Sequence, residues 1–398
     1  MKALTVPTFR NYLFGAFFSE TGNQMQTVAV AWQVYELTRN PVSLALIGLS
    51  HILPILGLSL IGGVAADKVD RKKILIISQS VMAILAFSLF LLTLFHLINP
   101  YFIYGILILS GVAQSFSMPA RQAILPNLVP SKFFMNAISL HTLQFQSATM
   151  IGPAIAGLLI AGFGVQSVYL FNSISYLIFI ATVLSIKQSL NIEHKNVEFN
   201  LKSIKEGISF VFKTPILYST MILDFLATFF GTANILMPVF AKDILHVGPQ
   251  GLGLLYSAPA LGGVLAGVLL SSIGKIKSQG RIILASVILY GLATIGFGLS
   301  KFLPISLGFL VMVGFGDMVS TIIRNTIRQM VTPDHLRGRM VSIMRMFFQG
   351  GPQLGEIEAG FLAKVIGGPA TVVVGGIGVV LITSIIAWKN RALRNYPS

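Results

Sequence analysis

The chain has 398 residues, of which 54% are hydrophobic and only 10% are charged, and it contains no cysteine. Because about a quarter of the residues in a soluble protein are charged, this composition excludes an ordinary soluble globular protein. The missing cysteine excludes disulfides, thiol catalysis and thiolate metal sites. The net charge of +15 is typical of Lys and Arg in the cytoplasmic loops of a membrane protein, rather than of nucleic-acid binding.

Apolar runs long enough to cross a bilayer as helices recur along the whole chain. The first run follows a short polar segment and has no cleavage signal after it, so we expect it to be retained as a membrane span. Hydropathy and helix-breaking residues predict twelve spans: 11–37, 43–66, 74–97, 101–120, 133–162, 165–186, 215–241, 250–273, 282–300, 303–323, 340–366 and 369–388. The sequence therefore predicts an all-α membrane protein.

Lys and Arg residues gather on one side of the predicted spans. An even number of spans places both termini on the same side, and that side holds all but a few of the 28 basic residues. The opposite loops hold only Arg39, Lys242, Lys301 and Lys364. Since basic loops stay in the cytoplasm, we expect both termini there.

One long polar connection, at 187–214, separates two sets of six spans. Its second part spaces Phe199, Ile204, Ile208 and Phe212 for one face of an interfacial amphipathic helix. We therefore predict an N-terminal six-helix bundle at 1–186, a cytoplasmic linker with this helix at 187–214, and a C-terminal six-helix bundle at 215–398.

An internal repeat supports this division. The segment that starts at Arg121 aligns without a gap with the segment that starts at Arg324, at an offset of 203 residues. The identical pairs include Arg121/Arg324, Ile124/Ile327, Pro130/Pro333, Ser139/Ser342, Gln146/Gln349, Gly152/Gly355, Ala156/Ala359 and Gly157/Gly360. A two-fold repeat of six helices around a central site is a transporter architecture.

Ionisable residues inside the spans are costly and mark candidate functional sites. Glu20 and Asp224 are related by an offset of 204 residues, and we predict that they carry protons or contact the substrate, with structural hydrogen bonding as the alternative. Glu20 is the preferred proton carrier because its helix has the denser polar stripe. Asp317 fits a structural ion pair with Arg324 or Arg328 as well as it fits a functional role.

The span 340–366 carries three ionisable residues that its repeat partner, 133–162, lacks: Arg345, Glu356 and Glu358. Arg345 and Glu356 share a helix face, whereas Glu356 and Glu358 differ by about 200° around the helix. One glutamate is therefore predicted to be a site residue, and Glu356 is preferred. Polar residues suited to an amphipathic solute follow the spans 11–37 and 133–162, namely Asn23, Gln24, Gln26, Gln33, Gln144 and Gln146.

The segment "GGVAADKVDRKK", which follows Ile61, concentrates charge between two apolar spans. Asp67 ends the span 43–66, where the helix dipole disfavours a carboxylate. We therefore expect it to have an external partner, either Arg71 or the positive N-terminus of a helix in the other half. Gly63 is expected to let another helix approach closely. The spacing of Gly63, Asp67, Asp70, Arg71 and Lys72 resembles the signature loop of the major facilitator superfamily.

Further motifs extend this resemblance. The sequence "GPAIAG" (Gly152, Pro153 and on to Gly157) resembles the helix 5 antiporter motif of the superfamily's drug-efflux branch. The segments "GNQMQTVAVAWQVYELT", "MPARQAILPNLVP" and "TPDHLRGRMVS" resemble the subgroup that holds enterobactin-type siderophore exporters and macrolide efflux pumps. The resemblance implies twelve helices in two pseudo-symmetric six-helix bundles, in a bacterial inner membrane. It also implies that the charged loop acts as a conformational clasp between the halves on the cytoplasmic side.

The sequence departs from the family pattern in two places. The equivalent loop of the second half, "SSIGKIKSQGR", keeps its bases and lacks the acid, so the clasp is expected on one side only. Many proton antiporters of the superfamily carry an arginine within helix 4, whereas the span 101–120 has none and Arg121 lies at its cytoplasmic end. This position weakens the case for proton coupling through that arginine.

We predict a secondary active transporter that exports a medium-sized amphipathic solute, siderophore-like or macrolide-like, by alternating access and proton antiport. Its partners would be the solute, protons and the lipid bilayer, with no nucleic acid, metal, cofactor or enzymatic site, and the chain is expected to be a monomer. One alternative is a facilitator or importer of an amphipathic or lipid-like solute without proton antiport. Another is a receptor or scaffold, which would need a sizeable soluble domain.

Overall fold

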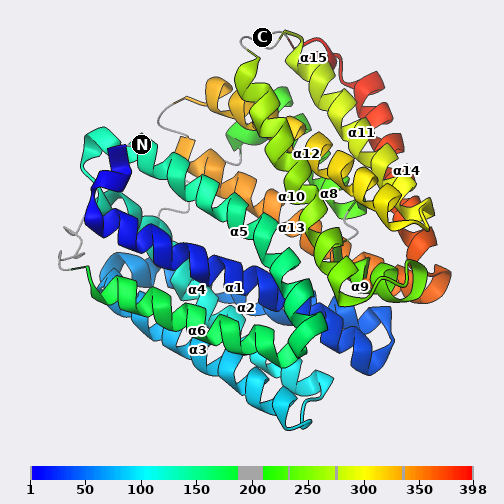
Figure 1. Cartoon of the computed structure of the whole chain (residues 1–398). Coiled ribbons are helices and arrows are strands. Elements are labelled where there is room, and N and C mark those ends of the chain that lie inside the picture. Colours follow the sequence, from blue (N-terminus) through cyan, green and yellow to red (C-terminus); the bar gives the residue numbers. More distant parts are fainter. Residues whose placement is uncertain (1, 187–208, 232–233, 274–276, 334–336, 397–398) are drawn as a thin grey trace. The chain divides into compact units, whose positions relative to one another are not determined.

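The computed structural model describes residues 2–186, 209–231, 234–273, 277–333 and 337–396, without some side chains of α2 and α13, and this part of the chain is helical throughout its regular structure. Its long helices are α1 (Pro7–Thr38), α2 (Pro41–Lys68), α3 (Arg71–Leu94), α4 (Pro100–Ile124), α5 (Phe134–Phe163), α6 (Val165–Leu184), α8 (Pro215–Gly231), α10 (Gly248–Ser272), α11 (Gln279–Leu299), α12 (Leu303–Val331), α13 (Arg337–Ile366) and α14 (Gly368–Lys389). The predicted all-α fold with twelve long helices is confirmed (Figure 1).

Within the described residues, nine helices are long and apolar enough to cross a membrane by length and composition. The other long helices include α1 and α13, which carry the acidic and amide side chains predicted as site residues. The described residues also form short elements: the 3-10 helices η1 (Lys2–Thr5), η2 (Leu125–Leu128), η3 (Ser131–Phe133) and η4 (Asn234–Leu236), with α9 (Met237–Val239), the π-helix η5 (Phe240–Ile244) and α15 (Arg391–Arg394).

Local sequence signals set many helix starts. Pro41 and Pro100 occupy the first positions of α2 and α4, where a missing N–H costs nothing. Asn40 and Asn99 precede them, and their side chains accept hydrogen bonds from main-chain N–H groups of the first turn, at 3.1 and 2.9 Å. Gly164, with φ of +80°, separates α5 from α6.

The span predicted at 215–241 corresponds to α8 followed by η4, α9 and η5. Residues 232–233 between α8 and η4 lie outside the description. The segment Pro215–Ile244 is long and apolar enough to cross a membrane, in agreement with the predicted span.

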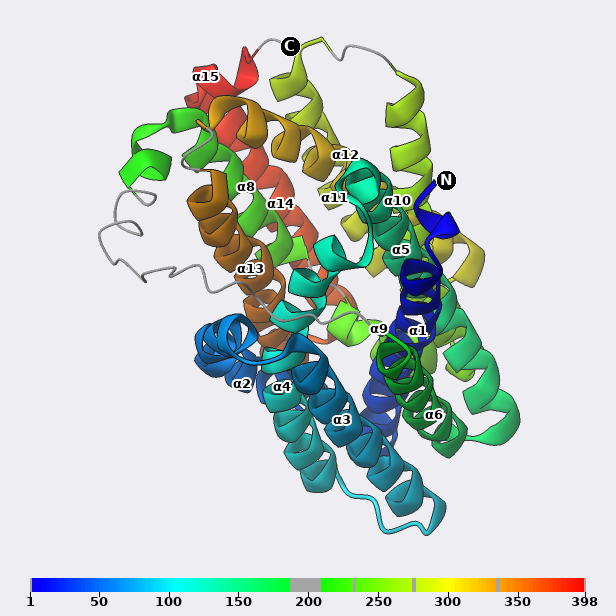
Figure 2. The ribbon, with the colours of Figure 1, turned by 90° about the vertical axis from the view of Figure 1, so that its left-hand side faces the viewer.

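The chain divides into two compact units: Met1–Asn196 with Val247–Ser257, and Val197–His246 with Ala258–Ser398. In the first unit α1 packs on α5 and α6, and α3 packs on α4 and α6 (Figures 1 and 2). In the second unit the repeat-related helices have the same neighbours, because α8 packs on α13 and α14, and α11 packs on α12 and α14. The predicted domain boundary at 187–214 falls largely outside the described residues and stays a prediction, as does the amphipathic helix, of which only 209–213 are described as helical.

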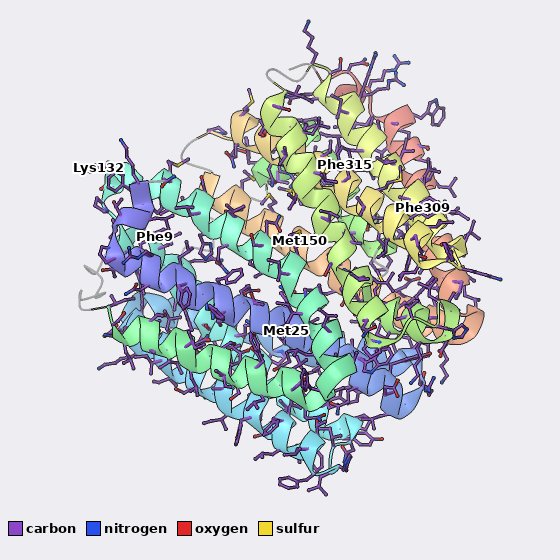
Figure 3. All side chains as sticks on the ribbon, in the orientation of Figure 1. Phe9, Met25, Lys132, Met150, Phe309 and Phe315 are labelled. Atoms are coloured by element: carbon purple, nitrogen blue, oxygen red, sulfur yellow. The ribbon has the colours of Figure 1, made fainter. Side chains whose placement is uncertain are left out.

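Each unit has a buried core and close helix contacts at glycine. Phe9 and Met25, labelled in Figure 3, are fully buried side chains of α1. A Cβ at Gly111 of α4 would lie 2.6 Å from the His51 carbonyl oxygen of α2, so only glycine allows this approach. Its repeat partner, Gly314 of α12, meets the main chain of α10 in the same way.

Candidate functional site

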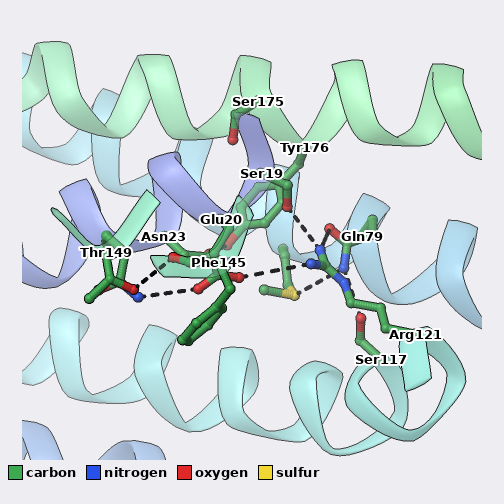
Figure 4. A network of polar contacts seen from close by, with 12 residues as sticks. Ser19, Glu20, Asn23, Gln79, Ser117, Arg121, Phe145, Thr149, Ser175 and Tyr176 are labelled. Carbon is green, nitrogen blue, oxygen red and sulfur yellow. Dashed lines mark hydrogen bonds and ion pairs between the residues drawn. The ribbon is translucent and has the colours of Figure 1, made fainter. Parts of the chain in front are cut away.

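Glu20 lies in the middle of α1 and forms a loose ion pair. Its carboxylate is 4.0 Å from the Arg121 guanidinium of α4, and both side chains are 18% exposed. The Gln24 side chain, one turn further along α1, donates a 3.2 Å hydrogen bond to the same carboxylate (Figure 4). The predicted proton carrier is therefore partly accessible and is not sealed into a tight pair.

Arg121 has several other partners besides Glu20. Its guanidinium donates to the Ser19 hydroxyl at 2.9 Å and to the Gln79 side-chain oxygen at 3.1 Å (Figure 4). It also lies 4.4 Å from the centre of the Phe179 ring. A cation over an aromatic face is stabilised by the ring quadrupole. The guanidinium would therefore keep hydrogen bonds and a ring contact if Glu20 lost its charge.

The structure places Arg121 in the last turn of α4, which ends at Ile124, so its predicted position at the end of this helix is confirmed. Helical side chains point toward the N-terminus of their helix, and this direction carries the guanidinium back to the level of Glu20. The predicted span, 101–120, ended four residues before Ile124 because it stopped at the last apolar residue before Arg121.

Some polar residues of α1 form hydrogen bonds with α6, and others form hydrogen bonds within α1. Gln33 accepts a 2.7 Å hydrogen bond from the Tyr169 hydroxyl, and Gln26 accepts one of 2.7 Å from the Asn172 amide, both from α6. Asn23 accepts a hydrogen bond from the Tyr176 hydroxyl. Part of the predicted polar stripe therefore binds α1 to α6, whereas Glu20 and Gln24 interact with each other.

Asp224 of α8 is buried with two arginines of α12. Its carboxylate lies 2.7 Å from the Arg324 guanidinium and 3.5 Å from the Arg328 guanidinium, and all three side chains are 2% exposed. Arg328 also donates to the Thr220 carbonyl oxygen at 2.9 Å. One carboxylate thus faces two buried positive charges.

Asp317, which was predicted as a partner of Arg324 or Arg328 or as a functional residue, lies two turns before Arg324 on α12 and is exposed. The Thr321 hydroxyl is hydrogen-bonded to Asp317 and accepts a 3.0 Å hydrogen bond from Arg324. The structure therefore connects Asp317 to the buried cluster through Thr321.

The two acid–arginine pairs occupy repeat-related positions. Glu20 and Asp224 differ by 204 residues, and Arg121 and Arg324 differ by 203. Both offsets are visible in the sequence, but the pairing of acid with arginine was not predicted. Each pair joins the first helix of its six-helix set to the fourth, because the repeat preserves the contact between these helices.

α13 contacts α8 closely through glycine. A Cβ at Gly351 would lie 3.0 Å from the Phe225 carbonyl oxygen, and Gly355 meets the Phe229 main chain. Glu356 and Glu358 are both half-buried, on either side of this contact. The Arg345 side chain lies outside the description, so its predicted relation to Glu356 stays a prediction.

The bases of the charged loop bind helix ends within the first unit. Asp70 caps α3 by accepting a 2.8 Å hydrogen bond from the Lys72 N–H. The Arg71 guanidinium donates to the Ala123 carbonyl of α4 at 2.7 Å, and the Lys72 ammonium donates to the Ile186 carbonyl after α6 at 2.8 Å. Basic side chains satisfy the free carbonyls at helix C-termini in this way.

The structure says less about the two other predicted clasp residues, Gly63 and Asp67. The Asp67 side chain lies outside the description, so the clasp between the halves stays a prediction. A Cβ at Gly63 would have no described atom within 4 Å. A Cβ at the preceding residue, Gly62, would overlap the Ser115 carbonyl oxygen of α4.

The helix 5 motif makes close contacts within the first unit. A Cβ at Gly152 would lie 2.8 Å from the Gln24 Cβ of α1, and one at Gly157 would lie 2.6 Å from the Pro249 carbonyl oxygen of α10, whose first turns belong to this unit. Pro153 is buried between them, and Gln146 is half-buried one and a half turns earlier. The motif therefore allows two close helix approaches.

Comparison with known proteins identifies several relatives over nearly the whole chain. The multidrug efflux pump Tap of Mycolicibacterium fortuitum is 27% identical over 90% of both chains. The staphyloferrin A transporter of Staphylococcus aureus is 27% identical over 96% of both. The enterobactin exporter EntS of Citrobacter koseri is 25% identical over 98% of this chain and 94% of its own.

Solved structures support the fold. The bacterial homologue of the human lysosomal transporter Spinster, inward-facing and occupied, has a TM-score of 0.76 over 98% of this chain and 97% of its own, at 12% identity. The nucleoside transporter NupG has a TM-score of 0.74 over 96% of this chain and 100% of its own, at 13% identity. The predicted fold of twelve membrane helices in two pseudo-symmetric bundles is confirmed. A family model described as transmembrane secretion effector matches residues 2–397, so this chain belongs to that family of major facilitator superfamily transporters.

Proposed function

We propose that this protein is a secondary active exporter of a medium-sized amphipathic solute, which it exchanges for protons by alternating access. The names of the relatives, which include siderophore transporters and a multidrug pump, favour a siderophore-like solute first and a macrolide-like drug next. The bias of Lys and Arg toward one side supports a bacterial cytoplasmic membrane with both termini in the cytoplasm. We propose that the chain works as a monomer.

The loose Glu20–Arg121 pair is the observation that carries the proposal of proton exchange. A carboxylate at 4.0 Å from its partner and 18% exposed can take up a proton from an open cavity. Protonation leaves Arg121 bonded to Ser19 and Gln79 and in contact with Phe179, so no guanidinium is left without a partner. The charge of Glu20 can therefore change at a small cost to the fold.

Asp224 is a poorer proton carrier for the opposite reason. Protonation of this carboxylate would leave two buried guanidinium groups, of Arg324 and Arg328, without their opposing charge. We therefore assign the proton to Glu20 and a structural role to Asp224. A solute that binds best when Glu20 is deprotonated would then be driven outward by the proton gradient.

Transport into inverted membrane vesicles tests this proposal. With a siderophore such as enterobactin, or a macrolide, as the probe, an imposed pH gradient should drive accumulation in the parent protein. Glu20→Gln should abolish gradient-driven accumulation and preserve substrate exchange, because exchange needs no net proton movement. Glu36→Gln, an exposed glutamate near the end of the same helix, is the matched control and should behave like the parent.

Two results would contradict the proposal. Gradient-driven accumulation that survives in Glu20→Gln would remove Glu20 as the carrier. Transport that ignores the gradient in the parent protein would favour the facilitator or importer without proton antiport.

A further inference from the structure

Three exposed basic side chains lie at one end of the second unit. Lys389 is the last residue of α14, Arg391 is the first residue of α15, and Arg281 lies in the first turn of α11. The end of α14 and the start of α11 lie at the same end of the unit, because α15 follows α14 directly and rests on Gly280 of α11 (Figure 1). We call Arg281, Lys389 and Arg391 the basic patch.

Packing fixes α15 on the end of the helix bundle. The Leu393 side chain is fully buried, and a Cβ at Gly280 would overlap the Leu393 carbonyl oxygen, so only glycine lets α15 approach α11 this closely. Asn390 joins α14 to α15: its side-chain oxygen accepts a 2.9 Å hydrogen bond from the Leu393 N–H, and its amide donates to the Ser219 hydroxyl of α8. The basic patch therefore lies on a packed part of the unit.

The basic patch lies at the boundary of the membrane. α11 and α14 both have the length and composition of membrane spans, so their ends meet the lipid headgroups. Trp388, which precedes Lys389, is 75% exposed, and tryptophan is enriched at this level of a bilayer because its ring is apolar and its N–H is polar. An exposed apolar ring beside basic groups matches a phospholipid, in which acyl chains adjoin a charged headgroup.

The sequence around the basic patch supplies no opposing charge. The chain has no Asp or Glu between Asp243 and Asp317, and none after Glu358. α11, α14 and α15 therefore carry basic residues and no acidic ones. Lys and Arg at a membrane surface attract anionic lipids, and the guanidinium group matches the geometry of a phosphate. The charge and the position of the patch both fit an anionic phospholipid.

We propose that the basic patch binds the headgroup of an anionic phospholipid, with phosphatidylglycerol as the representative lipid. Arg281 and Arg391 donate hydrogen bonds to the phosphate, Lys389 adds a third positive charge, and the Trp388 ring packs against the acyl chains. The bound lipid holds the start of α11 and the end of α14 together where α15 joins them. This site belongs to a different unit from Glu20 and goes beyond the proposed exchange of a solute for protons.

Quenching of tryptophan fluorescence by brominated lipids tests the site in the full-length protein. Bromine on an acyl chain quenches only a tryptophan that the lipid contacts. In phosphatidylcholine vesicles, brominated phosphatidylglycerol should quench Trp388 more strongly than the same small fraction of brominated phosphatidylcholine. The chain has two tryptophans. The other, Trp32, is 8% exposed, and its signal is measured in the variant Trp388→Phe and subtracted.

Substitutions in the basic patch should weaken this preference. Arg281→Gln and Arg391→Gln should each lower the affinity for phosphatidylglycerol, relative to phosphatidylcholine, by up to about fivefold, because one basic residue near an anionic surface contributes about 1 kcal/mol. Lys301→Gln is the matched control for net charge, since Lys301 is exposed beyond the opposite end of α11, and it should leave the preference unchanged. All three side chains are exposed, so the substitutions leave the packed core intact.

Three results would overturn the proposal. The first is equal quenching of Trp388 by the two brominated lipids in the parent protein. The second is an undiminished preference for phosphatidylglycerol in the double variant Arg281→Gln/Arg391→Gln. The third is relief of the quenching by soluble glycerol phosphate, which would assign the basic patch to free phosphate esters. None of these measurements uses a proton gradient, so failure here leaves the Glu20 proposal to its own test.

Discussion

Replacing Asp224 with Asn removes the carboxylate that faces Arg324 at 2.7 Å and Arg328 at 3.5 Å. All three side chains are 2% exposed. A charge pair at 4 Å gains about 4 kcal/mol at an effective dielectric constant of about 20, before the cost of desolvation. Breaking a buried pair by removing one partner costs about 3–5 kcal/mol, because the other charge stays buried. We therefore expect Asp224→Asn to lower the free energy of unfolding by about 3–5 kcal/mol.

Glu20→Gln is the repeat-related control. This pair is 4.0 Å apart and 18% exposed, and Arg121 keeps its bonds to Ser19 and Gln79. Exposed ion pairs contribute about 0–1 kcal/mol, so we expect a change within that range. Denaturant unfolding in one detergent, followed by helical circular dichroism, measures both variants.

A second variant separates charge from shape. Arg324→Met removes one of the two buried positive charges and keeps most of the side-chain volume, so the double variant Asp224→Asn/Arg324→Met should recover part of the lost stability. Equal losses in Asp224→Asn and Glu20→Gln, or no recovery in the double variant, would refute the reasoning.

Three further predictions concern the first unit. Gly62→Ala should destabilise the protein by about 1–3 kcal/mol, because its Cβ would overlap main-chain atoms of α4, whereas Gly63→Ala should be tolerated; thermal unfolding compares the two, and equal midpoints would contradict this. Lys72→Met should cost about 1 kcal/mol through loss of its bonds to the end of α6, and the exposed Lys73→Met should be neutral in the same assay. Asp67→Asn should shift the protein toward cytoplasm-open states and slow transport without unfolding it; unchanged accessibility of a cytoplasmic-cavity label would count against the clasp.

The helices could be predicted from the sequence because the bilayer imposes a simple pattern, in which long apolar runs are separated by short polar turns. One boundary was wrong for a physical reason. α12 runs on to Val331 instead of 323, because a helix continues beyond the membrane where its polar residues find partners, as Arg324 and Arg328 do.

The candidate site was predicted in part. Glu20 and Asp224 stand out in the sequence because an isolated acid in an apolar run is costly. Their partners could not be predicted from hydropathy, because Arg121 and Arg324 lie near the ends of their helices, where basic residues are ordinary. The nearly equal offsets, 204 residues between the acids and 203 between the arginines, were the available signal. Glu358 could not be preferred over Glu356 from the sequence, because a helical wheel shows the direction of a side chain but not the cavity that it lines.

The repeat explains why two similar pairs can have different properties. Duplication supplies each half with an acid on its first helix and an arginine on its fourth, but the surroundings then differ. In the first half Arg121 also donates hydrogen bonds to Gln79 and Ser19, so its guanidinium has hydrogen-bond partners without Glu20. In the second half Asp224 forms ion pairs with both Arg324 and Arg328, so protonation of Asp224 would weaken two buried ion pairs. We propose that a carboxylate that shares its partner, as Glu20 does, can change its protonation state, whereas one that lies against two buried guanidinium groups keeps its charge. A stability test of the two acids therefore also tests which half carries the proton.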